Sequence, residues 1–177
     1  MLFRSEQVIE VLAGGAPRFP VNIPTVNAES MAVIGPFIDA AAVAARVARQ
    51  LASGSLQKVR IQYSGEIANH DTKPLKLSVL VGLLDSISDE KVSAVNAPAR
   101  AEAHGIRIEE ETAAAEEPYA NLVTVTVGTD RGEERVAATN TGEGARVVAI
   151  NRYAVNVSEG SAHFLAIENV DKPGSIG

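Results

Sequence analysis

The stretch GPFIDAAAVAARVARQLASGSLQKVRIQYSGEI, residues 35–67, joins a helical pattern to a strand pattern and thereby decides the fold class. Its first part repeats apolar residues at spacings of three and four, the pattern of one helix face, at Phe37, Ala41, Ala44, Val47 and Leu51. Pro36 suits the first turn of this helix, and Gly54 suits the position after its end. In 56–67, apolar Val59, Ile61 and Tyr63 alternate with polar residues, as in a strand with one face in water. A helix packed on one face of a sheet is therefore expected.

The rest of the chain separates into helical and strand-like halves. Further helices are predicted over 5–13, 74–88 and 91–105, and residues 18–26 read as an extended connector because they hold two prolines. The expected strands, with turn glycines Gly132, Gly142 and Gly144 between the later ones, cover 105–111, 121–129, 133–141, 145–155 and 163–169. We predict an α+β, two-layer fold, with helices packed on one face of a mainly antiparallel sheet whose later strands form a meander.

Composition limits the function classes. The 177 residues suffice for one domain, or for a domain with fragments of its neighbours. A net charge of −6 argues against nucleic acid as a partner, and the absence of cysteine excludes disulfides, thiolate metal sites and a cysteine nucleophile. Glu6 and Glu10 interrupt any signal-peptide core, and no uncharged apolar run is long enough for a spanning helix. We expect a soluble protein without membrane contact, and a cytoplasmic location by default.

The loop 65–75 is the one place where an acid, a base and a cation crowd together in sequence. Glu66, His70 and Asp71 lie there, and a His–Asp pair can act as a general base or hold a metal. A small hydrolase or lyase is therefore one reading. A structural role is favoured, because adjacent side chains project in different directions and Asp71 suits a cap for the helix beginning near residue 74.

Other charged residues have structural readings as well. His104 lies where a helix C-terminus favours a cation, and the contiguous carboxylates of 107–117 are typical of a solvated surface rather than a calcium loop. Arg146 and Arg152 are expected on the same side of one strand, about 20 Å apart. A guanidinium at a sheet rim can clamp a carboxylate or phosphate, although a plain surface arginine is the common case.

Several phrases together resemble the downstream half of the long-form D-3-phosphoglycerate dehydrogenase family. They match in order and spacing, and are VNIP (21–24), VRIQYSGEIANHDTKPL (59–75), GLL (82–84), VNAPARAEAHGI (95–106) and ENVDKPGSIG (168–177). The resemblance implies the end of the catalytic portion at 1–18 and an intervening regulatory, or allosteric substrate-binding, domain at 19–160. Residues 161–177 would be the first strand and turn of a truncated ACT domain, so the chain is expected to be a fragment.

The resemblance also implies a function. The family's catalytic residues and dinucleotide-binding glycines belong to the missing part, so no catalytic residue and no cofactor are expected here, whereas the parent enzyme of L-serine biosynthesis uses NAD. Expected partners are the parent's catalytic domains, further copies of the chain, and a small anionic effector or phosphorylated substrate bound by Arg146 and Arg152. An incomplete ACT-type ligand site is implied at Asn169, Asp171 and Gly174. A pure oligomerisation module remains the third reading.

Overall fold

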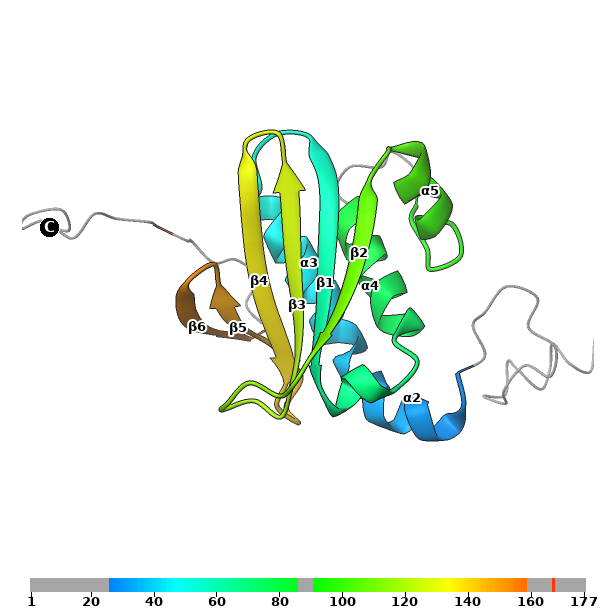
Figure 1. Ribbon diagram of the computed structural model, residues 1–177, viewed down its shortest axis with the longest axis vertical. Helices are drawn as coiled ribbons and strands as arrows, with labels where there is room; N and C mark the ends of the chain where they lie inside the picture. Colours follow the sequence, from blue (N-terminus) through cyan, green and yellow to red (C-terminus); the bar gives the residue numbers. More distant parts are fainter. Residues whose placement is uncertain (1–25, 86–90, 159–166, 168–177) are drawn as a thin grey trace, which may run out of the picture.

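A computed structural model describes residues 26–85, 91–158 and 167, and these form two layers (Figure 1). One layer is a six-stranded sheet in the order β2-β1-β3-β4-β5-β6. The strands are β1 (Leu56–Gly65), β2 (Arg107–Ala113), β3 (Asn121–Thr129), β4 (Gly132–Asn140), β5 (Ala145–Ile150) and β6 (Tyr153–Ser158). Four neighbouring pairs are antiparallel and only β1–β2 is parallel. The predicted α+β fold with a mainly antiparallel sheet is confirmed.

The helical layer begins with three consecutive elements, α2 (Ala28–Ile34), η1 (Gly35–Phe37) and α3 (Ile38–Leu51). Helical structure starts seven residues before the predicted position, because the Asn27 side chain caps α2 by accepting a hydrogen bond from the Ser30 N–H at 2.6 Å. By length and composition alone the run 28–51 could cross a membrane. Eight residues of α3 are buried among the sheet and α4, which is the pattern of a core helix.

The second long helix, α4 (Lys73–Leu84), packs directly on α3. Gly82 permits the close approach, since a Cβ added there would lie 2.6 Å from the Ala42 carbonyl oxygen. Shorter elements are η2 (Glu66–Asn69) and α5 (Ala97–Ala103). Pro98 lies in the first turn of α5, so the helix predicted over 91–105 is confined to its second half, and His104 is its C-terminal cap as expected.

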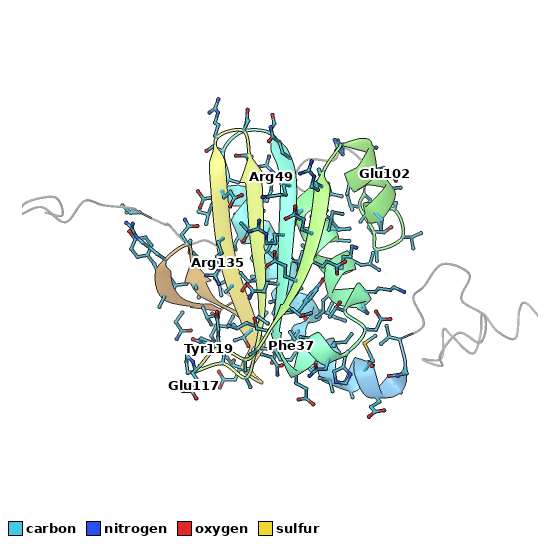
Figure 2. The ribbon with its side chains drawn as sticks, viewed as in Figure 1. Phe37, Arg49, Glu102, Glu117, Tyr119 and Arg135 are labelled. Atoms are coloured by element: carbon cyan, nitrogen blue, oxygen red, sulfur yellow. The ribbon has the colours of Figure 1, made fainter. Side chains whose placement is uncertain are left out.

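The hydrophobic core lies between these layers. Alternation along β1 turns Val59, Ile61 and Tyr63 toward the helices, and all three are almost fully buried. We call this side of the sheet the helix face and the other side the open face. In the described part of the chain no helix covers the open face (Figure 1). Tyr119 of the β2–β3 connector (Figure 2) packs against a small buried cluster of Leu122, Ala137 and Val148.

Two predicted features of the sheet are wrong. The strand at 107–113 does not begin a meander, because α4 and α5 carry the chain across the sheet and return it parallel to β1, which separates β2 from β3. The segment 145–155 is not one strand, because the chain reverses at Asn151, whose φ of 53° is left-handed. Asn151 and Arg135 exchange two hydrogen bonds, of 2.7 and 2.9 Å, which hold this turn against β4.

Predictions at the two ends fall largely outside the described residues. They are the helix over 5–13, most of the connector over 18–26, and the strand and turn over 161–177. The proposed ACT-type residues Asn169, Asp171 and Gly174 also lie outside.

Candidate functional site

Arg146 lies in β5 between two core residues, and alternation therefore places its side chain on the open face. Its guanidinium Nη1 donates a 2.7 Å hydrogen bond to the Asn156 side chain of β6, and Nη2 lies 3.6 Å from the Glu143 carboxylate. The Arg146 side chain is 26% exposed, whereas that of Glu143 is 83% exposed. A half-buried guanidinium with a weakly held carboxylate beside it can accept another anion in exchange.

Arg152 does not join Arg146. It lies in the turn between β5 and β6, where its guanidinium stacks over the Tyr153 ring, 4.9 Å from the centroid, and donates to the Tyr153 hydroxyl at 2.5 Å. Arg146 is paired in register with Ser158, at the open end of the same hairpin. The expected placement on one side of a single strand is therefore wrong, because the turn at Asn151 divides that strand.

Glu66, His70 and Asp71 lie in one loop, but His70 and Asp71 contact different parts of the molecule. His70 Nδ1 lies 3.2 Å from the Ser30 hydroxyl, and Asp71 accepts a 3.1 Å hydrogen bond from the first amide of α4. Glu66 is exposed in η2. The N-cap of α4 is Thr72, whose side chain makes no capping bond, and Asp71 lies one residue before it and binds the first helical amide instead. The separate contacts of His70 and Asp71 favour structural roles for these two residues over a general acid–base site.

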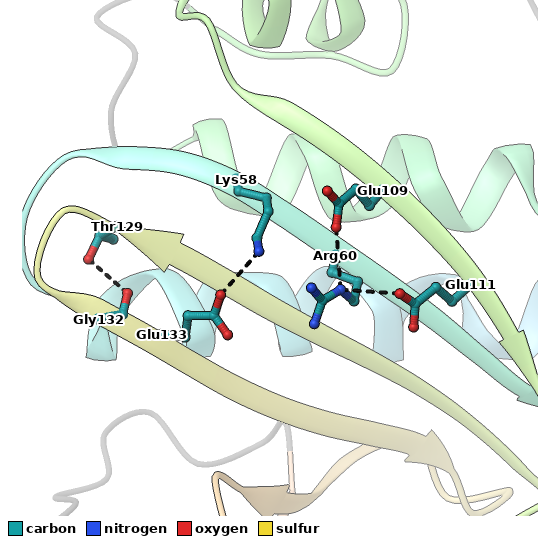
Figure 3. Close-up of polar contacts among 7 residues, drawn as sticks. All are labelled: Lys58, Arg60, Glu109, Glu111, Thr129, Gly132 and Glu133. Atoms are coloured by element: carbon teal, nitrogen blue, oxygen red, sulfur yellow. Dashed lines mark hydrogen bonds and ion pairs between the residues drawn. The ribbon is translucent and has the colours of Figure 1, made fainter.

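The carboxylates of the acidic strand β2 have specific partners on both faces of the sheet. Glu109 and Glu111 point to the open face and bracket the Arg60 guanidinium at 3.4 and 3.2 Å (Figure 3). Glu110 points to the helix face, where it accepts hydrogen bonds from the Tyr63 hydroxyl at 3.0 Å and the Lys76 ammonium at 2.7 Å. The two-residue strand period in the sequence would have predicted this division.

Tyr63 is the buried titratable group of this network. Burial, and then the negative charge of Glu110, raise the pKa of the Tyr63 hydroxyl far above its ordinary value. The hydroxyl is therefore a permanent donor at neutral pH, and it fixes the Glu110 carboxylate beside α4. In the described residues no cluster of three histidine or acidic side chains could hold a metal.

Comparison with known proteins assigns the family. A model of the D-3-phosphoglycerate dehydrogenase intervening domain matches residues 33–151, from within α2 to the Asn151 turn. The chain belongs to the D-3-phosphoglycerate dehydrogenase intervening domain family. The resemblance drawn from the sequence is confirmed, and Arg146 lies inside the matched region whereas Arg152 lies just beyond it.

Similar curated proteins carry the same name. D-3-phosphoglycerate dehydrogenases of Methanocaldococcus jannaschii, Archaeoglobus fulgidus and Bacillus subtilis are 29%, 30% and 30% identical to this chain. Each match covers 98% of this chain and 33% of the relative. The chain thus spans about a third of the length of the curated relatives it matches.

Proposed function

We propose that this intervening domain is a non-catalytic regulatory and assembly unit of an NAD-dependent D-3-phosphoglycerate dehydrogenase in L-serine biosynthesis. The match of its folded body to the intervening-domain family carries the proposal. The separate hydrogen-bond partners of His70 and Asp71 weigh against the hydrolase or lyase reading. The catalytic residues and the NAD site would belong to other parts of the parent enzyme.

Arg146 is the proposed binding residue for an anionic effector or a phosphorylated substrate. Asn156 holds one guanidinium nitrogen from the neighbouring strand, so the group is oriented before a ligand arrives. Glu143 is its only carboxylate neighbour among the described residues, and a pair at 3.6 Å whose carboxylate is largely exposed contributes little stability. A phosphate or carboxylate could replace Glu143 without opening the core.

The location of Arg146 supports a coupling role. Its hydrogen bond joins β5 to β6, the last described strand before residues 159–166, so an anion at Arg146 would act on the strand that leads out of the domain. A ligand that binds one arrangement of the neighbouring domains better than another would shift the parent enzyme toward it. Arg152, Asn169, Asp171 and Gly174 are proposed as further ligand contacts at that junction, and homo-oligomers as the assembled form.

Calorimetry on the folded chain tests this assignment. Phosphohydroxypyruvate titrated into the wild-type chain should release heat that saturates, and Arg146→Met should abolish it. Arg131→Met is the matched control, because it removes the same charge from the exposed β3–β4 turn and should leave the heat unchanged. Wild-type protein without heat would refute anion sensing and favour a pure oligomerisation module, which light scattering on the same sample would detect as a stable oligomer.

A further inference from the structure

A cavity lies on the open face, at the end of the sheet where β1 and β2 begin and β3 ends. Its volume is about 420 Å³, and its walls include Lys58, Arg107, Gly128 and Glu133. On β4, Glu133 precedes Thr139, the register partner of Arg146, by six residues, a separation of about 20 Å along a strand. The cavity is therefore distinct from the Arg146 site.

Two cations of this cavity are neighbours in the sheet. Lys58 of β1 is paired in parallel register with Arg107 of β2, so both side chains project from the same face. The Lys58 ammonium reaches across β3 and lies 3.1 Å from the Glu133 carboxylate (Figure 3). Arg107 is exposed, and within the described part of the chain its guanidinium has no hydrogen bond or ion pair. Two positive charges thus face one negative charge.

The floor of the cavity is Gly128. It is the register partner of both Lys58 and Glu133, so the ion pair passes over a position without a side chain. A Cβ at Gly128 would lie 3.5 Å from two Lys58 carbons and 3.6 Å from the Glu133 carboxylate, which is ordinary contact. The backbone there does not require glycine, since Gly128 is not among the residues with positive φ. Glycine inside a strand often marks the close approach of another group.

The next cation along β1, Arg60, is already paired with carboxylates of the protein and serves for comparison. Arg60 projects from the same face as Lys58 but is bracketed by two carboxylates, Glu109 and Glu111. It has no surplus charge to offer a ligand. Lys58 has one carboxylate partner, and the two side chains are 26% and 53% exposed. A single, partly exposed pair contributes little stability, so another anion can replace Glu133.

We propose that this cavity is a second anion site, which takes a small molecule carrying a carboxylate or phosphate group. Lys58 and Arg107 hold the anion, Gly128 leaves room for it, and Glu133 is the internal occupant that it displaces. The bare carboxylate of Glu133 already shows the kind of group that the Lys58 ammonium binds. This site is independent of the function proposed for Arg146.

Backbone amide NMR of the whole chain tests the second site. Inorganic phosphate, and acetate in a parallel series, are titrated at constant ionic strength while the Gly128 and Thr129 amide shifts are followed. Saturable shifts are expected in at least one series, and comparison of the two assigns the preferred group. The absence of saturable shifts in both series would overturn the proposal.

Single variants should change the affinity for the anion in opposite directions. Glu133→Gln frees Lys58 and should tighten binding about two- to fivefold, the range expected for an exposed ion pair. Lys58→Met and Arg107→Met should each weaken binding at least as much, and Gly128→Ala should weaken it by filling the floor. Equal weakening by the control Arg60→Met, or unchanged binding in Glu133→Gln, would show a diffuse charge effect and refute the site.

Two checks keep the outcomes separate. Thermal unfolding of each variant identifies any change that comes from lost structure, and Glu133→Gln tests the site by a gain that unfolding cannot mimic. Arg146→Met should leave the Gly128 shifts intact. If the Gly128 amide shift does not change with added anion while Arg146-dependent heat is present, only the second site is refuted.

Discussion

Replacement of Gly82 by alanine should destabilise the domain by about 2 kcal/mol. The new Cβ would lie 2.6 Å from the Ala42 carbonyl oxygen and 3.2 Å from the Ala45 Cβ, so α3 and α4 must separate. Overpacking of this kind costs about 1–3 kcal/mol, and the upper part of the range applies because the obstacle is backbone rather than a flexible side chain. Alanine returns up to about 1 kcal/mol through its higher helix propensity.

Gly35→Ala is the matched control. Gly35 has helical φ and ψ of −51° and −46°, and a Cβ there would make ordinary contact with Met31 at 3.7 Å. Pro36 follows Gly35, and a Cβ on the residue before proline disfavours helical φ and ψ, so this penalty offsets the gain in helix propensity. Gly35→Ala should therefore change the unfolding free energy by less than about 1 kcal/mol. Urea unfolding followed by circular dichroism measures both variants. If Gly82→Ala were as stable as the wild type, the close approach of α3 and α4 would not be a constraint, and the reasoning would fail.

Three further predictions concern single side chains. Because burial and a neighbouring carboxylate raise the pKa of Tyr63, its contribution to stability is complete below the unfolded pKa of about 10 and is lost as pH rises above it, so urea unfolding at increasing alkaline pH should show a loss that Tyr63→Phe reduces. Asn27→Ala removes the cap that accepts the Ser30 amide and should lower the unfolding free energy by about 1 kcal/mol, whereas Asn27→Asp should retain it. Asn151→Ala should lower the unfolding free energy by about 2 kcal/mol in the same assay, because alanine disfavours the left-handed backbone and cannot accept the hydrogen bond from the Arg135 amide. Asn151→Gly loses the same bond but tolerates the backbone, so its unfolding free energy should fall by less. Equal decreases for the two variants would contradict the backbone part of the argument.

Local patterns in the sequence predicted the elements that local physics controls. The helix over 38–51 and the strand over 56–65 follow from periodicity, and the hairpin at Gly132 follows from turn chemistry. The position of β2 did not follow, because the pairing of β1 with β2 depends on a crossover and not on any nearby residue. The turn at Asn151 was missed because asparagine is a weaker turn signal than glycine.

The candidate sites also combine features that local sequence predicts with features that depend on strand pairing. Arg146 could be singled out by residue type and by resemblance, but its partner Asn156 depends on the register of a hairpin that was predicted as one strand. Lys58 and Arg107 are neighbours only because β1 and β2 run parallel, so nothing in the sequence alone placed them together. Site residues that meet through sheet register required the fold first.

β1 lies between β2 and β3, so the edge strand β2 is held in the sheet through β1 alone. Its contacts with β2 join residues 49 positions apart, as in the Arg60–Glu109 pair, and its other neighbour, β3, follows later still in the chain. Closing segments of this length carries an entropy cost that local hairpins avoid. Detachment of β1 would leave β2 without a partner in the sheet and expose the helices. Loss of β1 alone should therefore be costly, and fraying should begin at the opposite edge of the sheet, in the hairpin of β5 and β6.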